Sequence, residues 1–256
     1  MRAWEAGSAV FFVYLAITAL VRGGRAGARP RALLAAVAGL LLSGASARMN
    51  EVPILHAWLL PPILLLTAYW GTGALFVAPM PRVERDLRGF DETLRIRSIA
   101  ARMPRAIAEI LEVAYSGVYP AVPLALWIAL DAGESAAHCW TVVLFTDYVC
   151  FGCLPWIQSR PPRALEDEPW RSRWRAVNLQ ILASGSIGAN TFPSGHAAEG
   201  LACALLVTRA PWPIVIAMFV NAGAIAAGAV FGRYHYAADA IFGWIVALIV
   251  WAVSGQ

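Results

Sequence analysis

Two short stretches of the sequence each place a histidine beside other reactive or charged residues. One is PSGH at 193–196 and the other is RYHYAAD at 233–239, and each stands where a long apolar run begins. Ionisable residues beside membrane segments are costly, so they indicate a functional site. His235 and Asp239 are four residues apart and would lie one turn apart on one helix face. The carboxylate can accept the proton of one ring nitrogen and leave the other nitrogen of His235 free to attack.

The residues before His196 predict a binding site for an anion. Ser194 and Gly195 precede the start of the next apolar helix. A helix start offers unpaired backbone N–H groups and a favourable dipole, both of which suit phosphate. His196 would face this anion and donate a proton to a leaving oxygen. Together with nearby arginines, the two histidines and the aspartate predict phosphoryl transfer that needs no metal and no cofactor.

The motif FPSGHAA at 192–198, followed about forty residues later by HxxxD, resembles the type-2 phosphatidic acid phosphatase superfamily. That superfamily includes lipid phosphate phosphatases and vanadium haloperoxidases. The resemblance covers roughly residues 54–254 and is sharpest between Arg160 and Asp239. It implies that His235 is the nucleophile that becomes phosphohistidine, that His196 protonates the leaving group and that Asp239 orients His235.

Two features depart from the usual pattern of that superfamily. Its first motif has a lysine seven residues before Arg-Pro, whereas here Arg160-Pro161 is preceded at that position by Cys153. Its third motif has Ser-Arg six residues before the histidine, but Ala229 stands there and the nearest arginine is Arg233. Because the chain has no lysine, we expect arginines to bind the phosphate, and their planar fork suits its oxygens. The expected phosphate-binding residues are Arg160, Arg163, Arg233, Ser194 and Gly195.

The resemblance implies an integral-membrane enzyme that cleaves a phosphate ester or pyrophosphate of a lipid. The run RPPR at 160–163 and the form RYHY at 233–236 look more like the branch that contains inositol phosphorylceramide synthases. Some members of that branch transfer a phosphoryl headgroup to another alcohol. Two alternatives therefore stay open: a phosphotransferase with the same first half-reaction, and a lipid-binding or transport protein that has lost catalysis.

The composition predicts a membrane protein of the all-α class. The chain is 59% hydrophobic and 14% charged, against about 25% charged in typical soluble domains. Its apolar runs are continuous rather than alternating, which favours helices over strands. We expect a polytopic bundle of about eight spans, with two additional helices in residues 1–50 and a six-helix catalytic core in 51–256. The expected segments are 5–22, 32–47, 54–78, 107–130, 136–158, 195–209, 212–231 and 236–254.

The distribution of arginine predicts how the chain sits in the membrane. If the loops alternate between the two sides, seventeen of the twenty arginines fall on the side onto which both histidine motifs open. Arginine-rich loops stay in the cytoplasm, so we expect a multi-pass protein of the cell (inner) membrane with a cytoplasmic active site. Reading residues 1–22 as a signal peptide is the alternative, and the arginines directly after them oppose it. Since the arginines lie in loops, the expected partners are membrane lipids and a lipid phosphate rather than nucleic acid.

Other polar residues carry weaker predictions. Glu199 falls one turn after His196 and is expected in the cavity, whereas Asp147 and Glu112 could line it or be paired by a neighbouring helix. The acids at 166–168 suggest a solvated turn rather than a metal site. Residues 80–106 form either an amphipathic surface helix or a solvated loop. The CxxC at 150–153 lies within an apolar run, which predicts buried apolar cysteines rather than a redox or zinc site.

Overall fold

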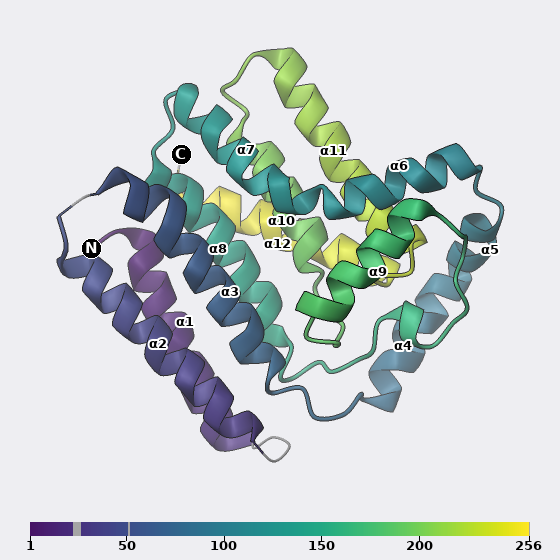
Figure 1. Cartoon of the computed structure of the whole chain (residues 1–256), viewed down its shortest axis with the longest axis horizontal. Helices are drawn as coiled ribbons and strands as arrows, with labels where there is room; N and C mark the ends of the chain where they lie inside the picture. Colours follow the sequence, from purple (N-terminus) through teal and green to yellow (C-terminus); the bar gives the residue numbers. More distant parts are fainter. Residues whose placement is uncertain (23–26, 51, 256) are drawn as a thin grey trace.

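The fold is a bundle of helices (Figure 1). This computed structural model describes residues 1–22, 27–50 and 52–255. Within those ranges the chain has no strand, only one isolated bridge between Ser159 and Asn190, so the predicted all-α class is confirmed. In chain order the elements are α1 (Ala3–Arg22), α2 (Ala28–Arg48), the π-helix η1 (Leu55–Leu59), α3 (Leu60–Gly73), α4 (Pro81–Thr93), α5 (Ile96–Ala101), α6 (Arg105–Ser116), α7 (Val118–Asp131), α8 (Ala136–Cys153), the 3₁₀ turn η2 (Pro162–Ala164), α9 (Arg173–Gly185), α10 (Gly195–Leu206), α11 (Trp212–Phe231) and α12 (Ala237–Val253).

The structure gives fewer full-length spans than the eight segments predicted. Among the described residues, four helices are long and apolar enough to cross a membrane: α1, α2, α8 and α11. The predicted segment 107–130 is two helices, α6 and α7, bent by 61° at Gly117, which directly follows Ser116, and this pair could serve as a fifth span. A Ser-Gly pair is a common place for a helix to break. A helical membrane bundle is therefore supported, and the number of eight spans is not.

Three apolar helices are shorter than a span: α12 has 17 residues, α3 has 14 and α10 has 12. Of these, α10 occupies the centre of the bundle, with α12, α11, α8 and α7 packed against it. Nearly all of its residues are buried, and many are glycine or alanine. Small residues let helix backbones approach closely. The PSGH motif therefore begins a helix that lies inside the protein.

The first two helices form an antiparallel hairpin that packs against α3 and α8 (Figure 1). The ring of Phe12 on α1 lies directly over Gly39 on α2, where a side chain would collide with it. At the other end of the hairpin, the Ser46 hydroxyl donates a 2.6 Å hydrogen bond to the buried carboxylate of Glu5. The hairpin is therefore integral to the packing of the bundle.

The predicted segment 80–106 is helical rather than an extended loop, and α4 is amphipathic. Its buried residues Glu84, Leu87 and Asp91 lie on one face, and that face packs against the start of α12. Two of these three are acids, so the buried face of α4 presents carboxylates to the core instead of a purely apolar stripe.

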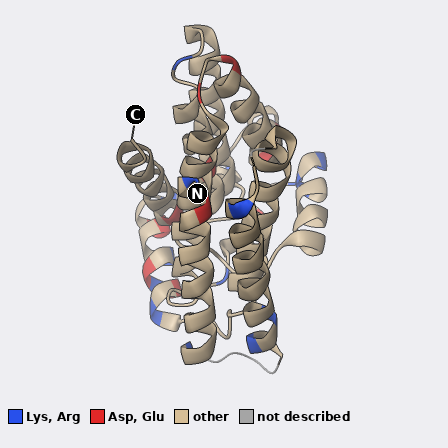
Figure 2. Cartoon of the chain, turned by 90° about the vertical axis from the view of Figure 1, so that its left-hand side faces the viewer, with Lys and Arg blue, Asp and Glu red and all other residues tan. Residues whose placement is uncertain are grey.

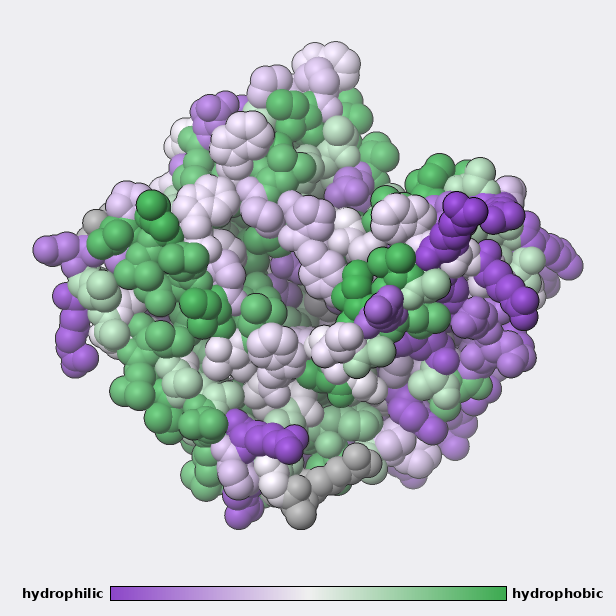
Figure 3. Space-filling view, in the orientation of Figure 1, coloured by the Kyte–Doolittle hydropathy of each residue, from purple (hydrophilic) through white to green (hydrophobic). Residues whose placement is uncertain are grey.

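The outer surface suits a lipid environment. Charged residues lie mostly near helix ends and in connecting segments (Figure 2). Large apolar side chains are exposed on the long helices, and on the face shown in Figure 3 they gather over α2 and α3, where Leu34, Leu41 and Leu66 are each more than 40% exposed. An apolar surface of this extent marks contact with a membrane or a partner, and the membrane helices identify it as lipid-facing.

Gly228 provides a test of how closely α11 and α6 must pack. A methyl group added at Gly228 would collide with the backbone carbonyl oxygen of Leu111, whereas one added at Gly223 on the same helix would meet nothing within 4 Å. We expect Gly228→Ala to destabilise the protein by about 1–3 kcal/mol, the usual cost of overpacking. Gly223→Ala should be neutral or stabilising, because alanine is the better helix former. Thermal unfolding midpoints in detergent measure both, and equal midpoints for the two variants would contradict the close packing.

Candidate active site

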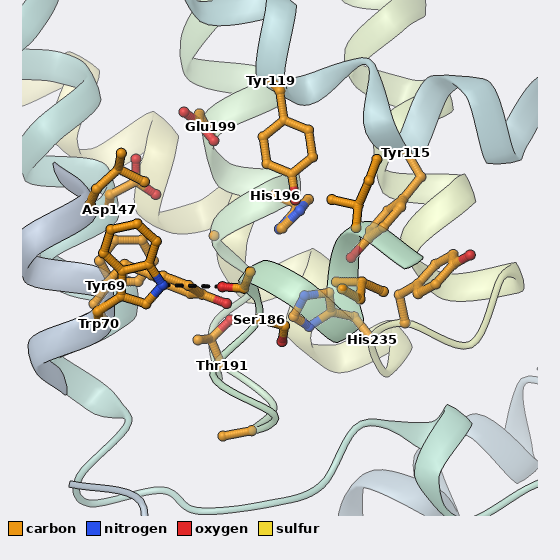
Figure 4. A pocket seen from close by; sticks show the side chains of 18 of the residues that line it. Tyr69, Trp70, Tyr115, Tyr119, Asp147, Ser186, Thr191, His196, Glu199 and His235 are labelled. Carbon is orange, nitrogen blue, oxygen red and sulfur yellow. Dashed lines mark hydrogen bonds between the residues drawn. The ribbon is translucent and has the colours of Figure 1, made fainter. Parts of the chain in front are cut away.

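A cavity of about 340 Å³ lies between α3, α9 and α10 and is lined by both predicted catalytic histidines (Figure 4). Figure 3 shows the hollow on its face of the molecule. The volume falls in the range of ligand pockets, about 300–1,000 Å³. The lining is mostly apolar and consists of Leu65, Leu66, Tyr69, Trp70, Tyr115, Tyr119, Asp147, Phe151, Arg163, Ile181, Leu182, Gly185, Ser186, Ala189, Thr191, Gly195, His196, Glu199, Tyr234 and His235.

Two hydrogen bonds connect α3 to the segment that follows α9 and so fix one wall of the cavity. The indole N–H of Trp70 donates to the carbonyl oxygen of Gly185 at 3.1 Å, drawn as the dashed line in Figure 4. The backbone N–H of Ile187 donates to the Tyr69 hydroxyl at 3.2 Å. A third connection leads to the loop before Arg160: the backbone N–H of Asn190 donates to the Ser159 carbonyl at 2.9 Å. The segments that carry RPPR and PSGH are thereby held side by side.

His235 lies in the turn between α11 and α12, and Asp239 lies in the first turn of α12. Its Nδ1 atom is 3.4 Å from Oδ2 of Asp239, and the same oxygen accepts a 2.9 Å hydrogen bond from the backbone N–H of Tyr236. Burial, followed by the nearby positive charge of Arg163, lowers the pKa of His235 below its ordinary value. A neutral imidazole has a lone pair on one nitrogen, so the environment favours the form of His235 that can attack phosphorus.

The start of α12 is held by a second carboxylate that the sequence did not point to. Asp91, on α4, accepts a 2.9 Å hydrogen bond from the backbone N–H of Ala237 through Oδ1 and binds the Arg233 guanidinium at 2.6 Å through Oδ2. Burial raises the pKa of Asp91, while both of these partners favour its charged form. Glu84, Leu87 and Asp91 have the spacing of one helix face, but this spacing alone does not show that the face is buried against α12.

His196, the second residue of α10, lies at the end of a stack of three rings. Its ring is parallel to that of Tyr115, with centroids 4.8 Å apart, and Tyr115 stacks in turn on Tyr234 at 3.9 Å. The ring of Tyr119 meets His196 edge-on at 5.7 Å. The centroids of His196 and His235 are 6.0 Å apart, so the structure brings the two histidines together on one cavity. Within the part of the chain that the structure describes, the Nε2 atom of His196 has no hydrogen-bond partner.

Ser194 and Gly195 occupy the N-terminus of α10, as the motif predicted, but they differ in access to the cavity. The Ser194 side chain is fully buried and accepts a hydrogen bond from the backbone N–H of Ala197 at 3.3 Å, which caps the helix. Gly195 lines the cavity. The backbone of Gly195 is therefore the part of this pair that can meet a ligand, and Ser194 supports the helix start.

Of the three expected arginines, only Arg163 lines the cavity. Its backbone N–H donates to the Arg233 carbonyl at 2.9 Å, and its Nη1 donates to the Tyr234 carbonyl at 3.3 Å. These bonds hold Arg163 against the turn that carries His235. Its guanidinium forms no ion pair within the described part of the chain, which leaves most of its N–H donors for an anion.

Arg160 and Arg233 lie outside the cavity, because each guanidinium is taken up by carboxylates. Arg160 binds Glu84 through Nε at 2.9 Å and Nη2 at 2.8 Å, and this pairing lowers the pKa of Glu84. Arg233 is 2% exposed and binds Glu166 at 3.0 Å as well as Asp91. Neither guanidinium lines the cavity, so the structure does not support the expectation that these two arginines bind phosphate there. Glu166, expected in a solvated turn, is instead a partner of the buried Arg233.

Glu112 is the centre of a buried hydrogen-bond network behind the ring stack. Its carboxylate accepts from the Tyr234 hydroxyl at 2.5 Å, from Asn178 at 2.7 Å, from Trp170 at 2.8 Å and from Arg175 at 3.1 Å. Of the two alternatives for Glu112, pairing by neighbouring elements is the one observed. The network fixes Tyr234, which directly precedes His235, and connects α6 to α9.

Asp147 and Glu199 both line the cavity, as the spacing from His196 predicted for Glu199 (Figure 4). Asp147 is 1% exposed, and its Oδ2 atom has no hydrogen-bond partner among the described residues. Across the described ranges, no group of three or more histidine, cysteine, aspartate or glutamate side chains is arranged to hold a metal ion. Cys139, Cys150, Cys153 and Cys203 are unpaired thiols.

Comparison with known proteins agrees with the geometry. A family model described as the PAP2 superfamily matches residues 80–253, which include the cavity residues from α6 to α12 and leave α1, α2 and α3 outside the match. No curated protein and no solved structure matches the chain significantly. The family match does not resolve the inositol phosphorylceramide synthase-like branch. Proteins of this superfamily are in general phosphatases and related phosphotransferases. The chain belongs to the PAP2 superfamily, the type-2 phosphatidic acid phosphatase superfamily that its histidine motifs resemble.

Proposed function

We propose that the protein is an integral-membrane lipid phosphate phosphatase that works through a phosphohistidine at His235. The observation that carries this proposal is the meeting of His235, His196 and Arg163 on one largely apolar cavity, with Asp239 behind His235. An apolar cavity suits a lipid, and His235, His196 and Arg163 together suit the one phosphate that a lipid phosphate carries.

In the first step, the free nitrogen of neutral His235 attacks phosphorus in line with the leaving oxygen. A P–N bond forms as the P–O bond to the lipid breaks. The Asp239 carboxylate, 3.4 Å from Nδ1, stabilises the positive charge that develops on the ring. Arg163 and the backbone N–H at Gly195 stabilise charge on the equatorial oxygens. His196 donates its proton to the departing alkoxide, which leaves as the lipid alcohol.

In the second step, His196 acts as the base. It takes a proton from water, the resulting hydroxide attacks the phosphohistidine, and inorganic phosphate leaves with His235 restored. The phosphotransferase alternative differs only in the acceptor, an alcohol in place of water. It is kept because of the RPPR and RYHY forms of the motifs, and it requires a site that excludes water.

The first prediction from the proposed function concerns the covalent phosphohistidine intermediate. Brief incubation of purified protein with a radiolabelled long-chain alkyl phosphate should trap an acid-labile phosphoenzyme. His235→Ala should abolish both the label and turnover, because the attacking nitrogen is gone. His196→Ala should slow turnover of substrates with poor leaving groups more than those with good ones, because only the former need its proton.

The control is His138→Ala, which removes a histidine at the start of α8 that does not line the cavity. Wild-type turnover by His235→Ala would refute the histidine nucleophile. With no alcohol added, a phosphatase releases inorganic phosphate. A phosphoenzyme that persists until an alcohol is supplied would favour the phosphotransferase.

The second prediction separates Arg163 from Arg160. Arg163→Ala should lower kcat/KM about 10²–10³-fold, as expected for losing one charged donor to the transition state. Arg160→Ala should lower kcat/KM far less, because its guanidinium is held by Glu84. Turnover of an alkyl phosphate by both variants, with folding checked by size-exclusion chromatography, measures the difference. Equal losses would show that the guanidinium of Arg160 reaches the substrate during catalysis.

We also propose that the active site faces the cytoplasm. Besides the arginine count, side-chain contacts place the end of α1 and the segment after α8 at the same end of the bundle. The Arg22 guanidinium, at the end of α1, donates to the Pro155 carbonyl after α8 and lies 4.6 Å over the ring of Trp156. At the other end of the bundle, Arg209 pairs with Glu134 at 3.0 Å.

The third prediction tests this sidedness in cells. In a variant without native cysteines, Glu168→Cys should resist a membrane-impermeant thiol reagent in intact cells and react once they are opened. Gly133 precedes the N-terminus of α8, whereas Glu168 follows its C-terminus, so Gly133→Cys should react in intact cells. These outcomes follow if arginine-rich loops are retained inside. Labelling of Glu168→Cys in intact cells would reverse the topology and indicate a lipid phosphate on the outer leaflet.

A further inference from the structure

Two carboxyl groups in the cavity have no part in the steps described above. Asp147 comes from α8 and Glu199 from α10, and both line the same cavity as the histidines (Figure 4). Asp147 is 1% exposed. Across the described ranges neither residue forms an ion pair, and Oδ2 of Asp147 accepts no hydrogen bond. The protein therefore presents two acids to its cavity without supplying a partner for them.

Such an arrangement is costly unless a ligand completes it. Burying a carboxyl group without a hydrogen-bond donor costs several kcal/mol, and acids within membrane segments generally serve a substrate or ion pathway. Other buried acids of this protein are paired: Glu112 accepts from four side chains and Asp91 from two groups. Asp147 and Glu199, the two acids that line the cavity, have no such partner within the described ranges, and a ligand in the cavity is placed to supply the missing donor.

The position of the two acids identifies the part of the ligand that meets them. Glu199 follows His196 by three residues and lies one turn farther along α10. A methyl group placed on Gly195 would lie 3.4 Å from Oδ1 of Asp147, so this carboxyl group lies against the start of the same helix. Both acids are thus on the His196 side of the site. In an in-line displacement the leaving oxygen points away from His235 and toward His196.

We propose that Asp147 and Glu199 bind an ammonium group carried by the leaving lipid alcohol next to its phosphate oxygen. The preferred substrates would then be phosphates of long-chain amino alcohols. An ammonium group supplies three N–H donors and a positive charge, which matches two carboxyl groups better than an uncharged hydroxyl does. The rings of Tyr69 and Tyr119, on the same cavity, can contact the cation through their faces. This inference rests on the proposed phosphatase function and specifies its substrate.

The test compares three synthetic phosphates of equal chain length: a 2-aminoalkyl phosphate, a 2-hydroxyalkyl phosphate and a plain alkyl phosphate. Purified full-length protein in detergent should hydrolyse the amino compound with a kcat/KM about 10- to 100-fold above that of the plain compound, the range for a hydrogen bond to a charged group. The Asp147→Asn, Glu199→Gln double variant, whose side chains keep their shape, should bring that ratio close to one. Asp131→Asn, an exposed acid at the end of α7 outside the cavity, should keep the wild-type ratio.

The outcomes separate this inference from the phosphatase function. If the plain phosphate is cleaved but the amino compound is no better, the ammonium site is refuted and the phosphatase stands. A preference for the hydroxy compound that the double variant abolishes would replace the ammonium by a polyol. An amino preference that survives in the double variant would refute the role of these two acids. If no compound is hydrolysed, the phosphatase function falls and this inference falls with it.

Discussion

The junction at which α12 begins is the constraint on which the active site depends. Two carboxylates meet there: Asp239 accepts from the Tyr236 N–H, and Asp91 accepts from the Ala237 N–H. Unpaired N–H groups at a helix start need such partners, and negative charge is favoured there. The same junction is bonded to the start of α10, since the backbone N–H of Ser194 donates to the Asp239 carbonyl at 2.9 Å. One set of hydrogen bonds thus fixes both histidines relative to each other.

The arginines near the site have two different roles, one that stabilises the backbone around the site and one that we propose binds the substrate. Arg233 has a left-handed backbone, with φ at 61°, which a non-glycine residue adopts only when its surroundings enforce it. Asp91 and Glu166 provide that enforcement by holding its guanidinium. The turn that presents His235 is therefore shaped by a buried ion triad, and breaking such a triad leaves charges without partners at a high cost. Within the described ranges, the side chain of Arg163 is bonded only to the Tyr234 backbone carbonyl, and Arg163 is the arginine that we propose meets the substrate.

The sequence predicted what depends on short spacing and on composition. The four-residue spacing was sufficient to pair His235 with Asp239, although His235 lies in the turn before α12 rather than on the helix with Asp239. The apolar runs located the helices, although the break at Gly117 and the burial of α10 depend on neighbours that no local pattern shows. Arg160 and Arg233 were expected on phosphate because they stand beside the motifs. Their carboxylate partners, Glu84 and Asp91, lie 76 and 142 positions away in the sequence, and only the fold reveals them.

The rim of the cavity affects which measure of substrate concentration determines the rate of binding. Leu66, Trp70 and Ile181 line the cavity, and each is also at least 40% exposed on the outside of the bundle. If the substrate is a lipid phosphate, as proposed, an opening bordered by apolar side chains of α3 and α9 would let it pass sideways into the cavity with its chain still in the hydrocarbon layer. The search for substrate then takes place in two dimensions. The encounter rate would then depend on the mole fraction of the lipid phosphate within the bilayer. Diluting the substrate with inert lipid would slow the reaction, as diluting a soluble substrate in water slows a soluble enzyme.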